Sequence, residues 1–241
     1  MIEKTFVYGD SFSNYKFANS LDASIQRKDM WYNHISVGDV IDRTKPGKSP
    51  YTMFLQATHD AITNTDPVRM IVALGACQRL TTYTDGWYEE ETLKDVDPNT
   101  PLPDPARRTT LTDCEPHLDR AEVNKQNMAQ FHPTLLWASI YKHTLDLALR
   151  CDTQGHQLII LHMNTTPDNT WINRSHPLIA PLCERAEALP NYITEHESCN
   201  HLCRQQGIRP MDYDTYGWHG HHGHDGHRYF GTYIAEKRPW N

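Results

Sequence analysis

Apolar residues along the chain gather into three short continuous runs. They cover residues 4–8 (KTFVY), 69–74 (RMIVAL) and 157–163 (QLIILHM), and the first two end directly at a glycine. Uninterrupted apolar runs of this length are typical of strands that are buried on both faces of a sheet. The sequence therefore predicts three buried strands.

Other segments place apolar residues at helical spacing. The pattern predicts helices over 51–63, about 122–151 with a bend near Pro133, 177–189, 195–206 and about 226–237. Strands that alternate with helices indicate a parallel sheet with helices on both faces. We expect one domain over residues 1–241, a three-layer α/β/α sandwich around a central parallel sheet. In such folds ligands bind beyond the carboxyl ends of the strands.

The segment at about 81–115 interrupts this alternation. Most of it (TDGWYEEETLKDVDPNTPLPDPARR) is rich in Pro, Asp and Glu, a composition that favours irregular structure. Long ordered loops are often functional. We therefore predict a long surface loop here, and we expect it to carry any specificity lid or partner contact.

Charge and composition exclude some classes of protein. The 241 residues carry a formal net charge of −7 and a mean hydropathy of −0.68. The sequence has no basic stripe that would bind nucleic acid and no run of about 18 apolar residues that would span a bilayer. Its first residues, MIEKTFVYGD, lack the regions of a signal peptide. We expect a protein that is cytoplasmic when synthesised and binds neither nucleic acid nor membrane.

Six cysteines are spread over the chain, at positions 77, 114, 151, 183, 199 and 203. A chain of this size without a secretion signal favours reduced thiols. Cys199 and Cys203 share a helix face, with His201 between them. A metal site there would need two more ligands. We therefore interpret them as ordinary thiols and predict no metal.

A Gly-Asp-Ser triplet follows the first predicted strand, in FVYGDSFSN. A serine at this point can expose its hydroxyl at the sheet rim, beside backbone N–H groups that can point at a developing oxyanion. The same triplet is also ordinary turn chemistry. Its position at the start of the chain favours a nucleophile, Ser11.

In this position the triplet resembles the first block of the SGNH hydrolases, also called GDSL esterases and lipases, in which the serine is the nucleophile. The second block of that family is a loop glycine that donates its N–H to the oxyanion hole. Gly47 in Pro-Gly-Lys-Ser matches it, and a plain turn glycine is an equal interpretation. The resemblance implies a flavodoxin-like α/β/α fold, ester hydrolysis and no cofactor.

The third block of the family is Gly-x-Asn, whose asparagine is an oxyanion donor. Gly75 is in place, but Cys77 stands where asparagine is expected. A thiol is a weak hydrogen-bond donor. Losing one oxyanion donor costs a factor of about 10²–10³ in rate. This departure favours impaired catalysis.

The last block is Asp-x-x-His with Gly-His at the start of the closing helix, where the histidine is the base and the aspartate orients it. Residues 217–234, GWHGHHGHDGHRYFGTYI, have this form, and the family spacing back from Gly226-His227 selects His221. Trp218 stands where the aspartate is expected. The nearby candidates for the missing acid are Asp214, taken first, and Asp212.

Other interpretations of this histidine-rich segment stay open. His219 and His222 are alternates for the base. The histidines could instead hold a metal, but they lie one or two apart on a glycine loop, unlike the i,i+4 pairs that bind zinc from a helix. A polar loop without chemistry is the third interpretation.

The favoured hypothesis is a serine esterase that acts on a small-molecule or glycan ester, for example an O-acyl group of a carbohydrate. Ser11, His221 and Asp214 would form the triad, with the N–H groups of Ser11 and Gly47 in the oxyanion hole.

The rival hypothesis is an SGNH-fold protein with impaired catalysis and a structural or binding role, such as a virion component. The short motif blocks with their departures resemble those of phage-encoded members of the family. A histidine-loop metal-binding protein is the weaker alternative.

Overall fold

The computed structural model describes residues 2–46, 48–75, 80–83, 108–111, 133–163 and 174–237. Its described strands form a five-stranded parallel sheet, in the order β2-β1-β3-β6-β7, and a two-stranded antiparallel sheet, β4-β5. The main sheet consists of β1 (Lys4–Tyr8), β2 (Asp39–Asp42), β3 (Arg69–Leu74), β6 (Gln157–His162) and β7 (Tyr192–Thr194). The small sheet consists of β4 (Leu80–Tyr83) and β5 (Arg108–Leu111).

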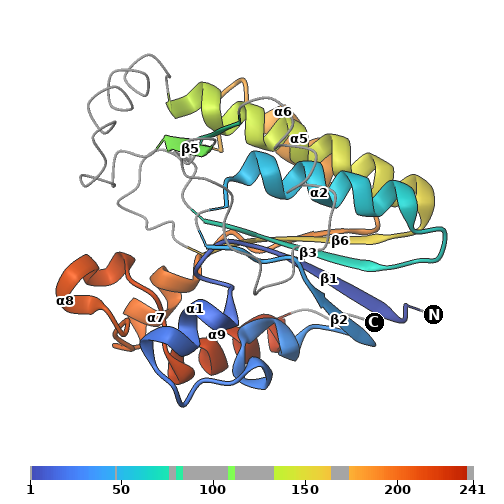
Figure 1. Cartoon of the computed structure of the whole chain (residues 1–241). Coiled ribbons are helices and arrows are strands. Elements are labelled where there is room, and N and C mark those ends of the chain that lie inside the picture. Colours follow the sequence, from blue (N-terminus) through green and yellow to red (C-terminus); the bar gives the residue numbers. More distant parts are fainter. Residues whose placement is uncertain are drawn as a thin grey trace.

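Helices cover both faces of the main sheet (Figure 1). One layer holds α2 (Pro50–Thr63), α5 (Pro133–Gln154) and α6 (Ala180–Glu187). The opposite layer holds α1 (Tyr15–Leu21), η1 (Arg27–Asp29), η2 (Trp31–His34), α7 (Cys199–Gln205), α8 (Tyr213–Tyr216), η4 (Gly217–His219) and α9 (His224–Lys237). Each layer packs its own apolar core against the sheet. The expected three-layer α/β/α sandwich is confirmed.

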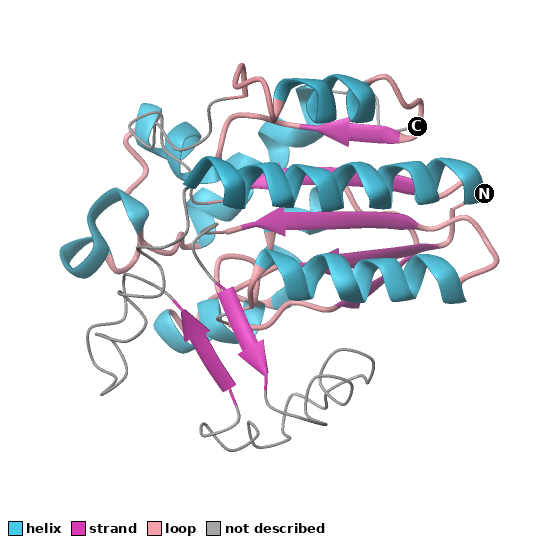
Figure 2. Cartoon of the chain, turned by 90° about the horizontal axis from the view of Figure 1, so that it is seen from above, coloured by secondary structure: helices cyan, strands magenta, loops and turns pink. Residues whose placement is uncertain are grey.

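The inner strands are buried because both of their faces meet a helical layer. All six residues of β3 are buried, as are the last five of β6. The strands of the main sheet run side by side in one direction beneath the long helices (Figure 2). Their carboxyl ends therefore share one edge, where β1 leads into residues 9–14 and β3 leads into Gly75.

The three apolar runs correspond to β1, β3 and β6, and the helices predicted at 51–63, 177–189, 195–206 and 226–237 are confirmed with ends shifted by a few residues. The prediction missed α1, β2 and β7. β2 lies at the sheet edge with no buried residue, and β7 has only three residues, so neither gives a strong apolar signal.

Two boundaries differ from the prediction. The loop expected at 81–115 contains strands at its described ends, because β4 pairs with β5 from Leu80↔Leu111 to Tyr83↔Arg108. The helix expected from about 122 begins at Pro133 in the described part of the chain, and 122–132 lie outside it. No helix in the described ranges combines the length and the apolar character needed to cross a membrane.

A buried carboxylate ties α2 to β1 and to the segment after β2. Asp60 on α2 accepts a hydrogen bond from the Tyr8 hydroxyl at 2.7 Å, and its two oxygens lie 3.3 Å from Nε and from a terminal nitrogen of Arg43. Burial, followed by the Asp60 charge, raises the pKa of Tyr8 well above its usual value, so the phenol stays a donor. Asp60 therefore accepts hydrogen bonds from a buried phenol and from a partly buried guanidinium at once.

We predict that Asp60→Ala lowers the free energy of unfolding by about 2–4 kcal/mol, because it removes the carboxylate that accepts from both the Tyr8 hydroxyl and the Arg43 guanidinium. Tyr8→Phe removes only one hydrogen bond and costs about 1 kcal/mol. Urea unfolding measures both. The exposed Asp66→Ala is the control, expected within about 0.5 kcal/mol of wild type. Equal losses for the Asp60 and Asp66 variants would contradict the prediction.

Candidate active site

The turn after β1 presents Ser11 at the carboxyl edge of the sheet. Asp10 is fully buried, and its Oδ1 accepts a hydrogen bond from the Phe12 N–H at 3.0 Å. The Asp10 carbonyl accepts a second bond from the Ser13 N–H at 3.1 Å. An aspartate that bonds the backbone two residues on is a compact turn motif. This turn fixes the backbone on both sides of Ser11.

Gly75, at the end of β3, makes room for this turn. A β-carbon at position 75 would lie 1.9 Å from Oδ2 of Asp10, far inside contact distance. Only glycine allows so close an approach of the backbone. The glycine that the sequence singled out in the third block therefore supports the serine turn through Asp10.

His221 joins Ser11 to a carboxylate. Its Nε2 lies 2.8 Å from Ser11 Oγ, and its Nδ1 lies 2.6 Å from Oδ2 of Asp212. Its backbone N–H also donates to Oδ1 of Asp212 at 2.6 Å. A carboxylate that accepts from Nδ1–H fixes the proton of the neutral imidazole on Nδ1. The lone pair is then on Nε2 and faces the serine hydroxyl, which is the arrangement of a general base. Serine, histidine and aspartate thus form one hydrogen-bonded chain.

Aromatic rings hold the imidazole in place. Phe12 stacks on His221 with ring centroids 4.5 Å apart, and Phe17 on α1 lies tilted against it at 4.6 Å. The side chains of His221 and Asp212 are each only 14% exposed. Partial exclusion of water strengthens the hydrogen bonds within the chain.

Asp214, which the sequence placed first as the orienting acid, is exposed on α8, whereas the alternate Asp212 contacts His221. The acid and the base are nine positions apart rather than three. Trp218, at the expected acid position, lies edge-on to Tyr213 at 5.1 Å and beneath the guanidinium of Arg204 at 5.9 Å. Trp218 is thus a packing residue.

The other histidines of the segment lie elsewhere. His222, an alternate for the base, is buried, with its Nε2 2.8 Å from Oδ1 of Asn200. His227 is buried in α9, and burial lowers its pKa to about 3, so it stays neutral. The side chain of His219, the other alternate, lies outside the described part of the structure. His221 is the one histidine recorded in contact with Ser11 among the described side chains.

His162, at the end of β6, is a structural residue. It is buried with its ring centroid 6.1 Å from that of Trp137, and burial lowers its pKa to about 3. The structure packs it as a neutral ring in the core.

One candidate oxyanion donor is described, and two further candidates lie outside the described residues. The Ser11 N–H makes no hydrogen bond to another described residue, so it can serve an oxygen of a substrate. Gly47 and Cys77, the second donor and the residue at the asparagine position, are outside the described ranges. Their roles remain predictions.

No family model and no curated protein matches this sequence. Solved structures that it resembles include a G-D-S-L family lipolytic protein from Veillonella parvula, at 13% identity, covering 98% of this chain and 97% of that chain with a TM-score of 0.44. The structure of TesA is 8% identical, with 98% of each chain covered and a TM-score of 0.48. The structure of the esterase EstA from Pseudoalteromonas sp. is 10% identical, with 98% of this chain and 97% of that chain covered and a TM-score of 0.46.

The first of these structures comes from the family whose motif blocks the sequence resembles. The strand order establishes the fold, and the hydrogen bonds around Ser11 define the candidate site.

Buried Lys48 links the segment just before α2 to that helix. Nζ of Lys48 donates to the carbonyl of Arg43 at 2.6 Å and to Oε1 of Gln56 on α2. Burial, followed by the charges of Lys45 and Arg43, lowers the pKa of Lys48 to about 7. The bonds fasten the loop to α2, but the protonated form of this lysine destabilises the fold.

We predict that Lys48 makes stability depend on pH. Its pKa is about 7 in the folded chain and about 10.5 when unfolded, so the unfolded chain binds more protons between these values. The unfolding free energy of wild type, minus that of Lys48→Met, should therefore rise from pH 7 to 10. Urea unfolding at several pH values measures the difference. The exposed Lys142→Met controls for loss of a positive charge, and parallel curves for wild type and Lys48→Met would refute the prediction.

Proposed function

We propose that this protein is a serine esterase of SGNH type. The observation that supports it best is the hydrogen-bonded chain from Ser11 Oγ through His221 to Asp212. The three groups come from opposite ends of the sequence and lie at the carboxyl edge of the sheet, where α/β folds place their ligands. A serine that contacts an oriented imidazole is activated for attack on an acyl carbon.

The chemistry follows from the geometry. Ser11 Oγ attacks the ester carbonyl carbon, and Nε2 of His221 takes the hydroxyl proton. Asp212 stabilises the resulting imidazolium, and the Ser11 N–H binds the oxyanion. The tetrahedral intermediate expels the alcohol, which receives the proton from His221. In the second half, His221 takes a proton from a water molecule that attacks the acyl-serine. The intermediate then expels Ser11 Oγ, which receives that proton, and the carboxylic acid is released.

The binding-protein hypothesis explains this arrangement less well. A protein with only a structural role has no need of a hydrogen-bonded chain in which a histidine lies 2.8 Å from a serine hydroxyl and 2.6 Å from an aspartate carboxylate. The cysteine at position 77 is the remaining point in its favour, since a lost oxyanion donor lowers the rate by about 10²–10³. We therefore propose a working but slow esterase, whose substrate is a small-molecule or glycan ester.

We predict that a fluorophosphonate probe labels Ser11 in the folded protein and that the chain hydrolyses 4-nitrophenyl acetate. Ser11→Ala should abolish both, because it removes the attacking oxygen. Mass spectrometry of the labelled peptide and absorbance of released nitrophenol measure them. Ser13→Ala is the matched control, since its buried hydroxyl has no hydrogen-bond partner within the described structure. Folded wild-type protein that is not labelled would refute the esterase proposal.

A second prediction separates the two candidate acids. Asp212→Asn should lower kcat by a factor of up to about 10⁴, because the amide cannot stabilise the imidazolium and favours the wrong tautomer. Asp214→Asn should leave kcat unchanged, since that side chain is exposed. Steady-state kinetics on 4-nitrophenyl acetate compares them. Equal losses for the two variants, or a loss only for Asp214→Asn, would exclude Asp212 as the orienting acid.

A further inference from the structure

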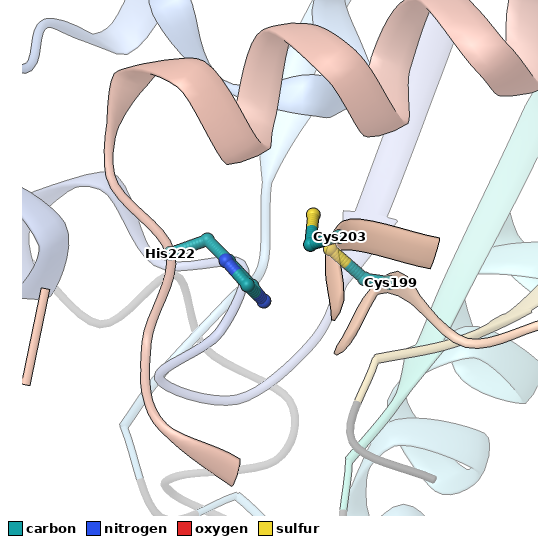
Figure 3. A group of neighbouring side chains, drawn as sticks. All are labelled: Cys199, Cys203 and His222. Atoms are coloured by element: carbon teal, nitrogen blue, oxygen red, sulfur yellow. The ribbon is translucent and has the colours of Figure 1, made fainter. Parts of the chain in front are cut away.

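Two cysteines and a histidine lie close to one another in a group outside the Ser11 site (Figure 3). Cys199 and Cys203 lie one turn apart on α7, and His222 lies in the segment just before α9. One ligand atom from each, two Sγ and an imidazole nitrogen, lies within 4.8 Å of the other two. All three residues are buried. We call them the Cys-Cys-His cluster.

Hydrogen bonds leave one imidazole nitrogen of the cluster available. Nε2 of His222 is 2.8 Å from Oδ1 of Asn200, an oxygen that can only accept, so Nε2 carries the proton. Nδ1 then holds a lone pair, and it is buried with no hydrogen-bond partner among the described residues. Metal-binding histidines usually donate their second N–H to an oxygen in this way.

The surrounding backbone holds the His222 ring in this position. A β-carbon at Gly226 would lie 2.6 Å from Cβ and 2.9 Å from Nδ1 of His222. The Cys203 thiol points at the Gly226 carbonyl, 3.9 Å away. Gly226 is therefore the point where the start of α9 approaches both a thiol and the imidazole, and a larger residue would push the ring aside.

Both thiols of the cluster are available as ligands, because neither cysteine forms a disulfide.

We propose that Cys199, Cys203 and His222 bind a zinc ion. Thiolate and imidazole are the ligands that Zn²⁺ prefers, and three protein ligands leave one of its four positions open. Ligand atoms around tetrahedral zinc lie about 3.5–3.8 Å apart, given bonds of about 2.0–2.3 Å, so the cluster needs to contract by only about 1 Å. Water fills the fourth position, since no other Cys, His, Asp or Glu of the described residues joins the cluster.

A zinc ion here would fix the segment that carries the proposed base, because His222 directly follows His221. It would link that segment to α7 without touching Ser11. The zinc site does not depend on the esterase proposal, and the two can be tested separately.

The experiment uses the reduced, metal-free full-length chain titrated with Co²⁺, whose thiolate charge-transfer absorption reports cysteine ligands. Wild type should bind one equivalent, which Zn²⁺ then displaces. Cys203→Ser and His222→Asn should lose this absorption, while Cys183→Ser, at a buried cysteine of α6 outside the cluster, should keep it. Ser11→Ala should bind as wild type does, which separates metal binding from hydrolysis.

Circular dichroism establishes that each variant is folded, and two independent variants protect the test against one that is not. Zinc should also raise the Tm of wild type but not that of His222→Asn. The proposal is overturned if reduced wild type binds no Co²⁺ or Zn²⁺, or if binding persists in both cluster variants. It is equally overturned if the pair only oxidises to a disulfide and never takes up metal.

Discussion

The hydrogen bond between His221 Nε2 and Ser11 Oγ joins positions 210 residues apart, and the candidate site depends on it. In this fold the parallel sheet and the layer that packs on it bring these positions together. β1 delivers Ser11 to the carboxyl edge of the sheet, and the last helical layer returns the chain to the same edge. A rim serine without this contact would be an ordinary turn residue, so the sheet topology is a condition for the chemistry.

Local packing makes that contact specific. Asp212 holds both the ring and the backbone N–H of His221, while Phe12 and Phe17 hold the faces of the ring. The next residue, His222, turns toward Asn200 and the buried thiols. Two consecutive histidines thus point to opposite sides of their own segment. His221 contacts Ser11, and His222 contacts Asn200 on α7. This double attachment explains how a loop rich in glycine can hold the His221 imidazole in one place.

The sequence predicted the parts of this arrangement that leave a local signal. Continuous apolar runs revealed β1, β3 and β6, and the motif spacing selected Ser11 and His221. The edge strand β2 and the short β7 lack such a signal. Asp212 and Asp214 are indistinguishable in MDYDTYGW, because the short helix α8 decides which carboxylate faces inward. The sequence also pointed to His201 beside the two cysteines, but His201 bonds Gln205 on the surface, and the third member of the cluster comes from a separate segment.

The displaced acid shows why spacing is a weaker guide than geometry. Between Asp212 and His221 the chain forms a loop that contains α8 and η4. A hydrogen bond from the Met211 N–H to the His221 carbonyl, at 2.7 Å, joins the two ends of this loop. Loop closure costs only about 0.6 kcal/mol for each doubling of loop length. The two hydrogen bonds from His221 to Asp212 outweigh so small a cost. A tryptophan at the expected acid position is therefore compatible with an aspartate beside His221, because the chain between Asp212 and His221 folds back and returns the carboxylate to the imidazole.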